Sequence, residues 1–407
     1  MPRYELIAGL DIGAAKVSLA LVRREYGSDH MQFAGCFSVA CDGLSSSGSV
    51  LDLTKLADAV AVVLEKSQEA VKQNISTAFV NISGTHISAE NVRGRSNLLS
   101  KENEISRKDL DSVYRNAKVS AISYDREPVL VVPQDYIVDG QRAIKNPVGL
   151  FGSRLDIDYL FVTGSTPAIG NLCKAVNMGG LEIEEIVLSN LASSFSALTA
   201  SEKDLGVVLV DIGDAVTEVS VFTDSVIRYD KMLAFGSADL AAVICEEFKI
   251  QRDIALKIIK NYCKLDFSGY SNPEEKILIK EISPPRAITQ GQLQKIIESN
   301  IKGILGKIKE TMQLSEYVSG ASCGIVLIGG ISSMDGLAEM AEPAFNMPVR
   351  VGFPKGINTT DHSNITALGL AIYGFQKRNS NGLRRQLSEN VLKRAFQATK
   401  DFIYDYF

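Results

Sequence analysis

The 407-residue chain has no tryptophan, only three histidines, and six cysteines without a Cys-x-x-Cys pair. Scattered histidines without metal-ligand spacing argue against a zinc site or a histidine-based catalytic triad. Since no secretion signal opens the chain, the thiols are expected to be reduced, as in a cytosolic protein. No apolar run is long enough to span a bilayer, so any contact with a membrane is expected at its surface.

The net charge is unevenly distributed along the chain. The net charge is −5, which disfavours nucleic acid as a partner. Residues 376–407 carry seven Lys or Arg against three Asp or Glu, a charge of +4, which leaves −9 for residues 1–375. A basic segment on an acidic body favours an acidic partner such as anionic lipid.

A weak internal repeat at an offset of 200 residues is the strongest signal in the chain. Residues 10–22 read LDIGAAKVSLALV, and residues 210–222 read VDIGDAVTEVSVF. Each copy has an apolar strand ending in Asp-Ile-Gly, a short turn and a second strand of alternating pattern. Because the chain is too long for one ordinary core, the repeat predicts two homologous α/β domains that face each other.

A third glycine turn follows an apolar strand in GIVLIGGISSMDG, residues 324–336, and a helical pattern continues from Leu337 to Phe345. Residues 84–163 combine short strands with one helix, which predicts a subdomain inserted into the first α/β domain. Other helices are predicted at 53–73, 168–178, 190–201, 237–263 and 289–313.

Two Asp-Ile-Gly turns facing one cleft have the chemistry of a phosphate clamp. Glycine lets the backbone approach a phosphate, and amides of the turns point at its oxygens. Asp11 and Asp211, at the strand ends, are candidates to hold Mg²⁺ directly or through water. Lys16 adds a positive charge, and the turn at Gly329 and Gly330 is expected to hold the adenosine side of a nucleotide.

The end of the chain, VLKRAFQATKDFIYDYF, has the pattern of an amphipathic helix with Lys393, Arg394 and Lys400 on its polar face. Residues 376–390 are polar without apolar periodicity and are predicted to be a linker. A terminal helix docked on the body is the alternative, but the linker, the basic face and the terminal aromatics favour membrane-surface binding. The predicted membrane-binding residues are Leu392, Lys393, Arg394, Phe396, Lys400, Phe402, Ile403 and Phe407.

The order of two phosphate turns and an adenosine turn resembles that of the actin, Hsp70 and sugar-kinase ATPases. More closely, the chain resembles the FtsA family of bacterial cell-division proteins. The similar stretches are NISGTHISAENVRGR (81–95), EISRKDL (104–110), PQDYIVDGQRAIKNPVGLFGSRL (133–155), ASSFSALTASEKDLGVVLVDIG (192–213) and MPVRVGFP (347–354). The resemblance covers nearly the whole chain and is weakest at residues 240–300.

The resemblance implies a duplicated, actin-like (ribonuclease H-like) α/β fold with an inserted α+β subdomain of SHS2 type. The implied division is domain 1A at 1–83 and 164–200, subdomain 1C at 84–163, domain 2A at 201–236 and 321–375, subdomain 2B at 237–320, a linker at 376–390 and an amphipathic membrane-targeting helix at 391–407. The implied nucleotide-binding residues are Asp11, Gly13, Ala14, Lys16, Asp211, Gly213, Thr217, Gly236, Gly329 and Gly330, with Asp211 also the candidate for catalysis.

By the same resemblance, the chain is expected to be an ATP-binding scaffold of cell division. It is expected to form filaments with itself on the cytoplasmic face of the inner membrane, at the septum. The implied partners are the C-terminal tail of the ring protein FtsZ, anionic membrane lipids, and later divisome proteins that bind subdomain 1C. The implied cofactors are ATP and Mg²⁺.

Several residues depart from the family pattern. Ala14 and Ala15 stand where the first turn usually offers a hydroxyl, Asp214 places a carboxylate beside the phosphate site, and Asn300 stands where an Arg contacts the FtsZ tail. Each hydrogen bond lost to a phosphate costs about 1.5–3 kcal/mol, so weakened ATP binding and at most slow hydrolysis are expected. The alternatives are a pseudo-ATPase scaffold of the same fold, and an actin-fold sugar kinase, Hsp70-like chaperone or pilus-assembly ATPase.

Overall fold

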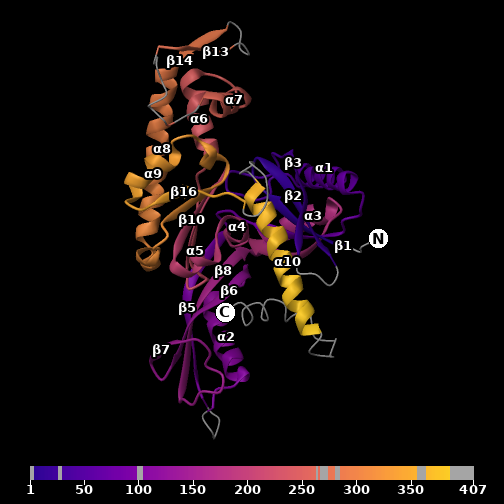
Figure 1. Ribbon diagram of the computed structural model, residues 1–407, viewed down its shortest axis with the longest axis vertical. Coiled ribbons are helices and arrows are strands. Elements are labelled where there is room, and N and C mark those ends of the chain that lie inside the picture. The colour runs from indigo at the N-terminus through magenta and orange to yellow at the C-terminus, as the bar shows by residue number, and fades with distance from the viewer. Residues whose placement is uncertain are drawn as a thin grey trace.

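The computed structural model describes residues 4–25, 30–98, 104–262, 265, 274–279, 285–354 and 364–385. Within these residues the strands form two five-stranded sheets, one four-stranded sheet and one two-stranded hairpin. Figure 1 shows the two large sheets side by side in the middle of the molecule, the four-stranded sheet at one end and the hairpin at the other.

The first large sheet has the strand order β3-β2-β1-β4-β9, and alternate residues of β1 pack on opposite faces. Leu10 joins a core with α1 and α3, whereas Ile7 joins a core with α10. This period of two is expected of a strand with helices on both sides. The elements are Tyr4–Ile12 (β1), Lys16–Glu25 (β2), Met31–Ala40 (β3), Leu53–Val71 (α1), Thr77–Ile82 (β4), Thr166–Met178 (α3), Glu182–Leu188 (β9), Ser189–Ala197 (α4) and Ile365–Arg385 (α10).

The second large sheet repeats the first, with the order β12-β11-β10-β15-β16. Asp11 lies opposite Ser18 across β1 and β2, and Asp211 lies opposite Glu218 across β10 and β11. The register is therefore kept at the 200-residue offset, and the repeat predicted from the sequence is confirmed. The elements are Ala200–Leu205 (α5), Val207–Ile212 (β10), Thr217–Thr223 (β11), Val226–Leu233 (β12), Ile325–Ile328 (β15), Leu337–Phe345 (α9) and Val349–Val351 (β16).

The four-stranded sheet is inserted in the first half of the chain and packs on both halves. Its order is β5-β8-β6-β7, and β5, β6 and β8 contact β12. The Gln134 side chain donates to the Arg228 carbonyl at 2.8 Å, and the Arg228 guanidinium donates to the Gln134 carbonyl at 2.6 Å. The elements are Ile87–Asn97 (β5), Arg107–Ala121 (α2), Arg126–Val138 (β6), Gln141–Ile144 (β7) and Arg154–Ser165 (β8).

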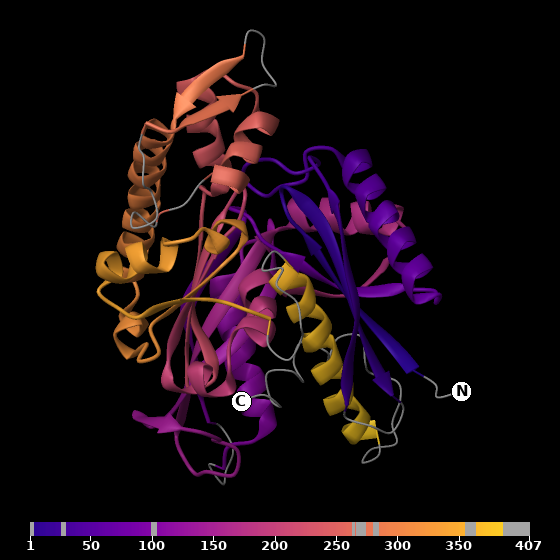
Figure 2. The ribbon, with the colours of Figure 1, turned by 45° about the horizontal axis from the view of Figure 1, so that its top comes forward.

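A helical lobe extends the second half, and its first helix is shorter than the sequence predicted. The single helix expected at 237–263 is two helices, because Lys249 adopts the left-handed conformation (φ 51°) and ends the first of them. Figure 2 shows the two helices below the terminal hairpin. The elements are Ser237–Phe248 (α6), Arg252–Tyr262 (α7), Lys276–Ile279 (β13), Arg286–Thr289 (β14), Gln290–Gln313 (α8) and the 3₁₀ turns Glu316–Gly320 (η2) and Gly330–Ser333 (η3).

Helix α10 extends into the segment predicted to be a linker, so that prediction is wrong for residues 376–385. Lys377 pairs with Glu185 of β9, and Arg378 pairs with Glu5 of β1 at 2.7 Å, which attaches this part of the helix to the first sheet. These charges replace the apolar stripe that the segment lacks. The predicted membrane-binding residues, at 391–407, lie outside the described residues. Among the helices that the structure describes, none is long and apolar enough to cross a membrane.

Candidate functional site

The two Asp-Ile-Gly turns are closed by the same hydrogen bond. The Gly13 amide donates to the Lys16 carbonyl at 3.0 Å, and the Gly213 amide donates to the Val216 carbonyl at 3.0 Å. These two amides are therefore used within the turns, and the amides left for a phosphate are those at the turn tips. The tips are Ala14 and Ala15 in the first turn and Asp214 and Ala215 in the second.

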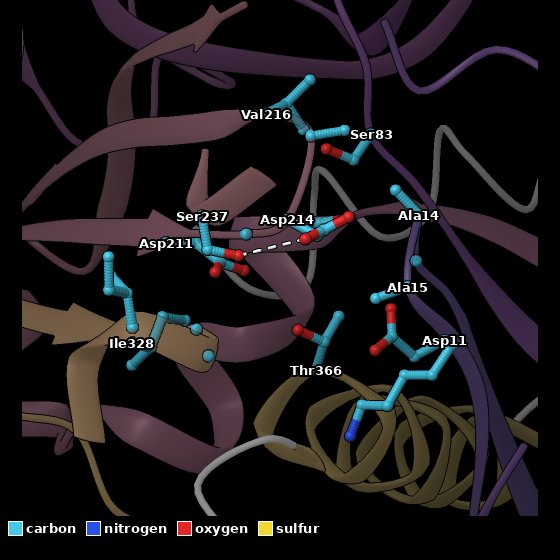
Figure 3. Close-up of a pocket in the computed structure, with 18 of the residues that line it drawn as sticks. Asp11, Ala14, Ala15, Ser83, Asp211, Asp214, Val216, Ser237, Ile328 and Thr366 are labelled. Carbon is cyan, nitrogen blue, oxygen red and sulfur yellow. Dashed lines mark hydrogen bonds between the residues drawn. The ribbon is translucent and has the colours of Figure 1, made fainter. Parts of the chain in front are cut away.

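The turns face each other across a cleft of about 770 Å³, a size typical of small-molecule sites. Figure 3 shows Asp11 and Asp211 on opposite sides of this cleft, with Thr366 of α10 between them. The structure thus brings together eight of the ten residues predicted to bind nucleotide: Asp11, Gly13, Ala14, Lys16, Asp211, Gly213, Gly329 and Gly330.

Thr217 and Gly236, the other two predicted residues, do not line the cleft. The buried Thr217 hydroxyl donates to the Phe235 carbonyl at 2.9 Å, so it joins β11 to the segment after β12. A Cβ at Gly236 would lie 2.4 Å from the Asp214 carbonyl oxygen. Both residues therefore support the second turn through contacts within the protein and do not face the ligand site.

Asp11 and Asp211 are held in an environment that disfavours two negative charges. Burial raises the pKa of Asp11 to about 6, and the nearby Lys16 opposes this rise. Burial and the charge of Asp11 raise the pKa of Asp211 to about 7. The Asn81 amide donates to the Asp11 carboxyl at 2.8 Å and fixes its orientation. Two such carboxyls suit a divalent cation, whose charge would remove the repulsion between them.

The third turn places glycine where no other residue fits. Gly329 has φ 92°, and a Cβ there would lie 2.3 Å from the Ile212 carbonyl oxygen and 2.5 Å from the Asp211 carboxyl. The end of β15 is therefore pressed against the end of β10. Helix α9 then begins at Leu337, after a 3₁₀ turn, and the helix predicted at residues 337–345 is confirmed.

Comparison with known proteins agrees with this architecture. Residues 208–369 match the family described as "Cell division protein FtsA", and residues 84–163 match "SHS2 domain inserted in FTSA". The chain is 31% identical to the cell division protein FtsA of Pseudomonas aeruginosa, over 94% of this chain and 92% of that protein. It is 30% identical to FtsA of Escherichia coli K12, over 91% and 90%. The chain belongs to the FtsA family.

Solved structures share the fold of this FtsA-family chain at low sequence identity. The PilM-PilN type IV pilus biogenesis complex matches with a TM-score of 0.63 and 16% identity, over 91% of this chain and 98% of that chain. MreB 5 of Spiroplasma citri bound to AMPPNP matches with a TM-score of 0.53 and 12% identity, over 94% and 100%. The predicted actin-like fold with an SHS2 insertion is confirmed.

The sequence analysis missed two residues, Asn81 and Asn364, whose side chains hold cleft residues in place. Lys16 donates to the side chain of Asn364 at 2.8 Å, which ties the first turn to the residue before α10. Asn81, in β4, accepts from the Ile12 amide at 2.7 Å and donates to the Ser189 hydroxyl at 3.0 Å. A polar side chain inside the apolar strand AFVNI was the signal available for Asn81, because such a residue needs buried partners.

The carboxylate of Asp214 is neutralised within this FtsA-family chain. The Arg252 guanidinium, from α7, lies 3.0 Å from one Asp214 carboxylate oxygen, and the Ser237 hydroxyl donates to the other at 3.1 Å. The sequence analysis expected Asp214 to repel a phosphate. The structure supplies a counter-charge that the analysis did not find, because the break at Lys249 is what places Arg252 beside the second turn.

A buried pair of acids lies behind Asp211. Glu218 accepts from the Asn190 amide at 3.0 Å, and Asp230 accepts from the Ser220 hydroxyl at 2.6 Å. Burial raises the pKa of Asp230 to about 6 and, with the charge of Asp230, raises the pKa of Glu218 well above its ordinary value. Burial therefore favours the neutral form of Glu218, which limits the negative charge at the wall of the cleft beside Asp211.

Proposed function

We propose that this FtsA-family chain binds Mg²⁺–ATP in the cleft and acts as a self-assembling scaffold of cell division at the membrane. The observation that carries the nucleotide proposal is the pair Asp11 and Asp211, which face each other between two turns of the same hydrogen-bonded form. The similarity to MreB 5, a structure bound to AMPPNP, supports this choice of ligand.

The cleft residues fit a magnesium nucleotide. Mg²⁺ in proteins commonly takes one or two carboxylates and completes its coordination with water and phosphate oxygens. Among the described residues, no cluster of three or more His, Cys, Asp or Glu forms a closed metal site. We propose that Asp11 and Asp211 hold Mg²⁺ directly or through water, that the turn tips and Lys16 bind phosphate, and that Gly329 and Gly330 receive the nucleoside.

We propose that hydrolysis is at most slow. Turnover needs a polar group that orients the attacking water. The Asn81 side chain uses its oxygen and its amide group within the protein, and the Ser189 hydroxyl donates to the Ile82 carbonyl at 3.1 Å. Asp211 is the candidate that we propose for this role, and a carboxyl engaged with Mg²⁺ is a poor base. A pseudo-ATPase differs from this proposal by failing to bind the nucleotide at all.

Calorimetric titration of the full chain with Mg-ATP tests the nucleotide proposal. We expect binding by the unaltered chain and a loss of at least about tenfold in Asp11→Asn, because one metal-binding charge is removed. Asp58→Asn is the matched control: it makes the same charge change on the exposed face of α1. The absence of binding by the unaltered chain would favour the pseudo-ATPase, whereas equal binding by all three proteins would place the ligand elsewhere.

We also propose that residues 391–407 bind the membrane surface and that assembly strengthens this contact. One short amphipathic helix binds only marginally, and each basic residue near anionic lipid adds about 1 kcal/mol. A filament presents many such helices to one surface, so their effective concentration turns weak contacts into firm attachment. The cytoplasmic face of the inner membrane, at the septum, is the location that the family supports.

The tether is tested by co-sedimentation with anionic vesicles. Phe396→Asp should abolish membrane association and leave the unfolding transition unchanged, because it places a charge on the apolar face of the predicted helix. Gln397→Asp adds the same charge to the polar face and should retain most of the binding. If the two variants sediment alike, the membrane proposal is wrong.

We propose the FtsZ tail, later divisome proteins and a second copy of this chain as partners, on the ground of the family alone. Asn300, which stands at the expected Arg position, donates its side-chain amide to the Ile296 carbonyl of its own helix at 2.9 Å. It is therefore not set to receive an acidic residue of FtsZ. A fluorescent FtsZ-tail peptide should bind the chain equally well after Asn300→Ala, and a large loss in that variant would restore Asn300 to the contact.

A further inference from the structure

A second cavity adjoins the nucleotide cleft at the tips of its two phosphate turns. It has a volume of about 540 Å³ and is lined by residues of both halves of the chain. Ala14 and Ala15 of the first turn and Asp214 and Ala215 of the second line both cavities. A phosphate held between the tips would therefore face both of them. Gly329 and Gly330, proposed to receive the nucleoside, line the first cavity and not the second, so the phosphate farthest from the nucleoside would lie nearest to the second.

Arg252 is the cation that lines this second cavity. Its guanidinium lies 3.0 Å and 3.4 Å from the two carboxylate oxygens of Asp214. The Asp214 side chain is 15% exposed, whereas that of Arg252 is 57% exposed. Because Ser237 also donates to Asp214, the carboxylate keeps one partner if the arginine turns away. Arg252 is thus the movable member of the pair.

Around the two cavities, the lining carboxyls outnumber the lining cations. The carboxyls that line them are Asp11, Asp42, Asp211, Asp214 and Glu218, and the cations among the described lining residues are Lys16 and Arg252. Lys16 belongs to the first half and is bonded to Asn364. A nucleotide triphosphate brings more negative charge to the tips, and Arg252 is the cation that the second half can supply.

We propose that Arg252 exchanges Asp214 for the terminal phosphate of the bound nucleotide and thereby makes the chain prefer ATP to ADP. The proposal rests on nucleotide binding in the cleft. A guanidinium binds a phosphate through two parallel hydrogen bonds, and such a contact is stronger than one neutral hydrogen bond. Since Arg252 lies on α7 and the first turn lies in the other half, the contact also links the two halves when a third phosphate is present.

The test compares Mg-ATP and Mg-ADP titrations of the full chain and its Arg252→Gln variant. The unaltered chain should bind ATP more tightly than ADP. Arg252→Gln should weaken ATP by about tenfold or more and ADP by less than about threefold, so that the preference disappears. Lys257→Gln, which removes an exposed charge from the same helix, is the matched control and should change neither affinity.

The double variant Asp214→Asn/Arg252→Gln separates this role from simple neutralisation of Asp214. If Arg252 binds the terminal phosphate, the double variant still binds ATP about tenfold more weakly than Asp214→Asn alone. If the two bind ATP equally, or if Arg252→Gln weakens ATP and ADP alike, the inference is overturned while nucleotide binding stands. If the unaltered chain binds neither nucleotide, both proposals are overturned together.

Discussion

Replacing Asp211 by Asn should stabilise the nucleotide-free protein and weaken its binding of the nucleotide. The pKa of Asp211 rises from its ordinary value of 3.8 to about 7 in the folded chain, because burial and Asp11 disfavour its charge. Such a rise corresponds to about 4 kcal/mol of penalty on the ionised form, and we expect about 2 kcal/mol once water in the cleft screens part of it. The neutral amide of Asn avoids this penalty.

The sign of the effect fixes its pH dependence. Because the pKa of Asp211 is raised in the folded state, the contribution of this residue to the free energy of unfolding is fully present below about pH 4. It is lost as the pH rises through about 7. Asp211→Asn should therefore exceed the unaltered chain in free energy of unfolding by about 2 kcal/mol at pH 8. The gap should close towards pH 4, where both side chains are neutral.

Urea unfolding of the nucleotide-free chain at pH 8 and pH 5 measures the gap, and the midpoint reports the change in stability. Asp58→Asn, on the exposed face of α1, is the control and should unfold like the unaltered chain at both values. The same Asp211→Asn protein should bind Mg-ATP at least about tenfold more weakly. Equal stabilities at pH 8, or a gap that widens at pH 5, would show that Asp211 is not held in the environment described.

Three further predictions follow from the geometry. Gly329→Ala should lower the free energy of unfolding by at least about 2 kcal/mol and abolish Mg-ATP binding, because its Cβ would meet the Ile212 carbonyl oxygen; an unchanged urea midpoint would refute this. Arg228→Met should lower the free energy of unfolding by about 2 kcal/mol and speed proteolysis within the four-stranded insert, because the Gln134 carbonyl loses its buried donor. Equal cleavage rates in the variant and the unaltered chain would contradict this prediction. Mg-ATP affinity should rise between pH 6 and pH 8 as Asp11 and Asp211 lose their protons. Calorimetry in buffers of different ionisation enthalpy should detect proton release on binding. A pH-independent affinity would argue against both carboxyls as metal ligands.

The sequence by itself determined the features that repeat or that follow a local period. Asp-Ile-Gly after an apolar strand occurs at both Asp11 and Asp211, and the spacing between them predicted two sheets of equal topology. The unbroken apolar runs of β1 and β10 indicated strands that are buried on both faces, as strands covered by helices on both sides are. The position of the insert followed from its own run of strands at residues 84–163.

The tertiary structure alone decided which distant side chains complete the cleft. Asn81 reaches Asp11 because β4 pairs with β1, and no local pattern records that pairing. Arg252 reaches Asp214 because the chain turns at Lys249, whose left-handed backbone is stabilised by packing of the two helices that it joins. Helix α10 continues past residue 376 because acidic residues of the first sheet receive its charges. These contacts join residues tens to hundreds of positions apart, and their free energy appears only once the sheets have assembled.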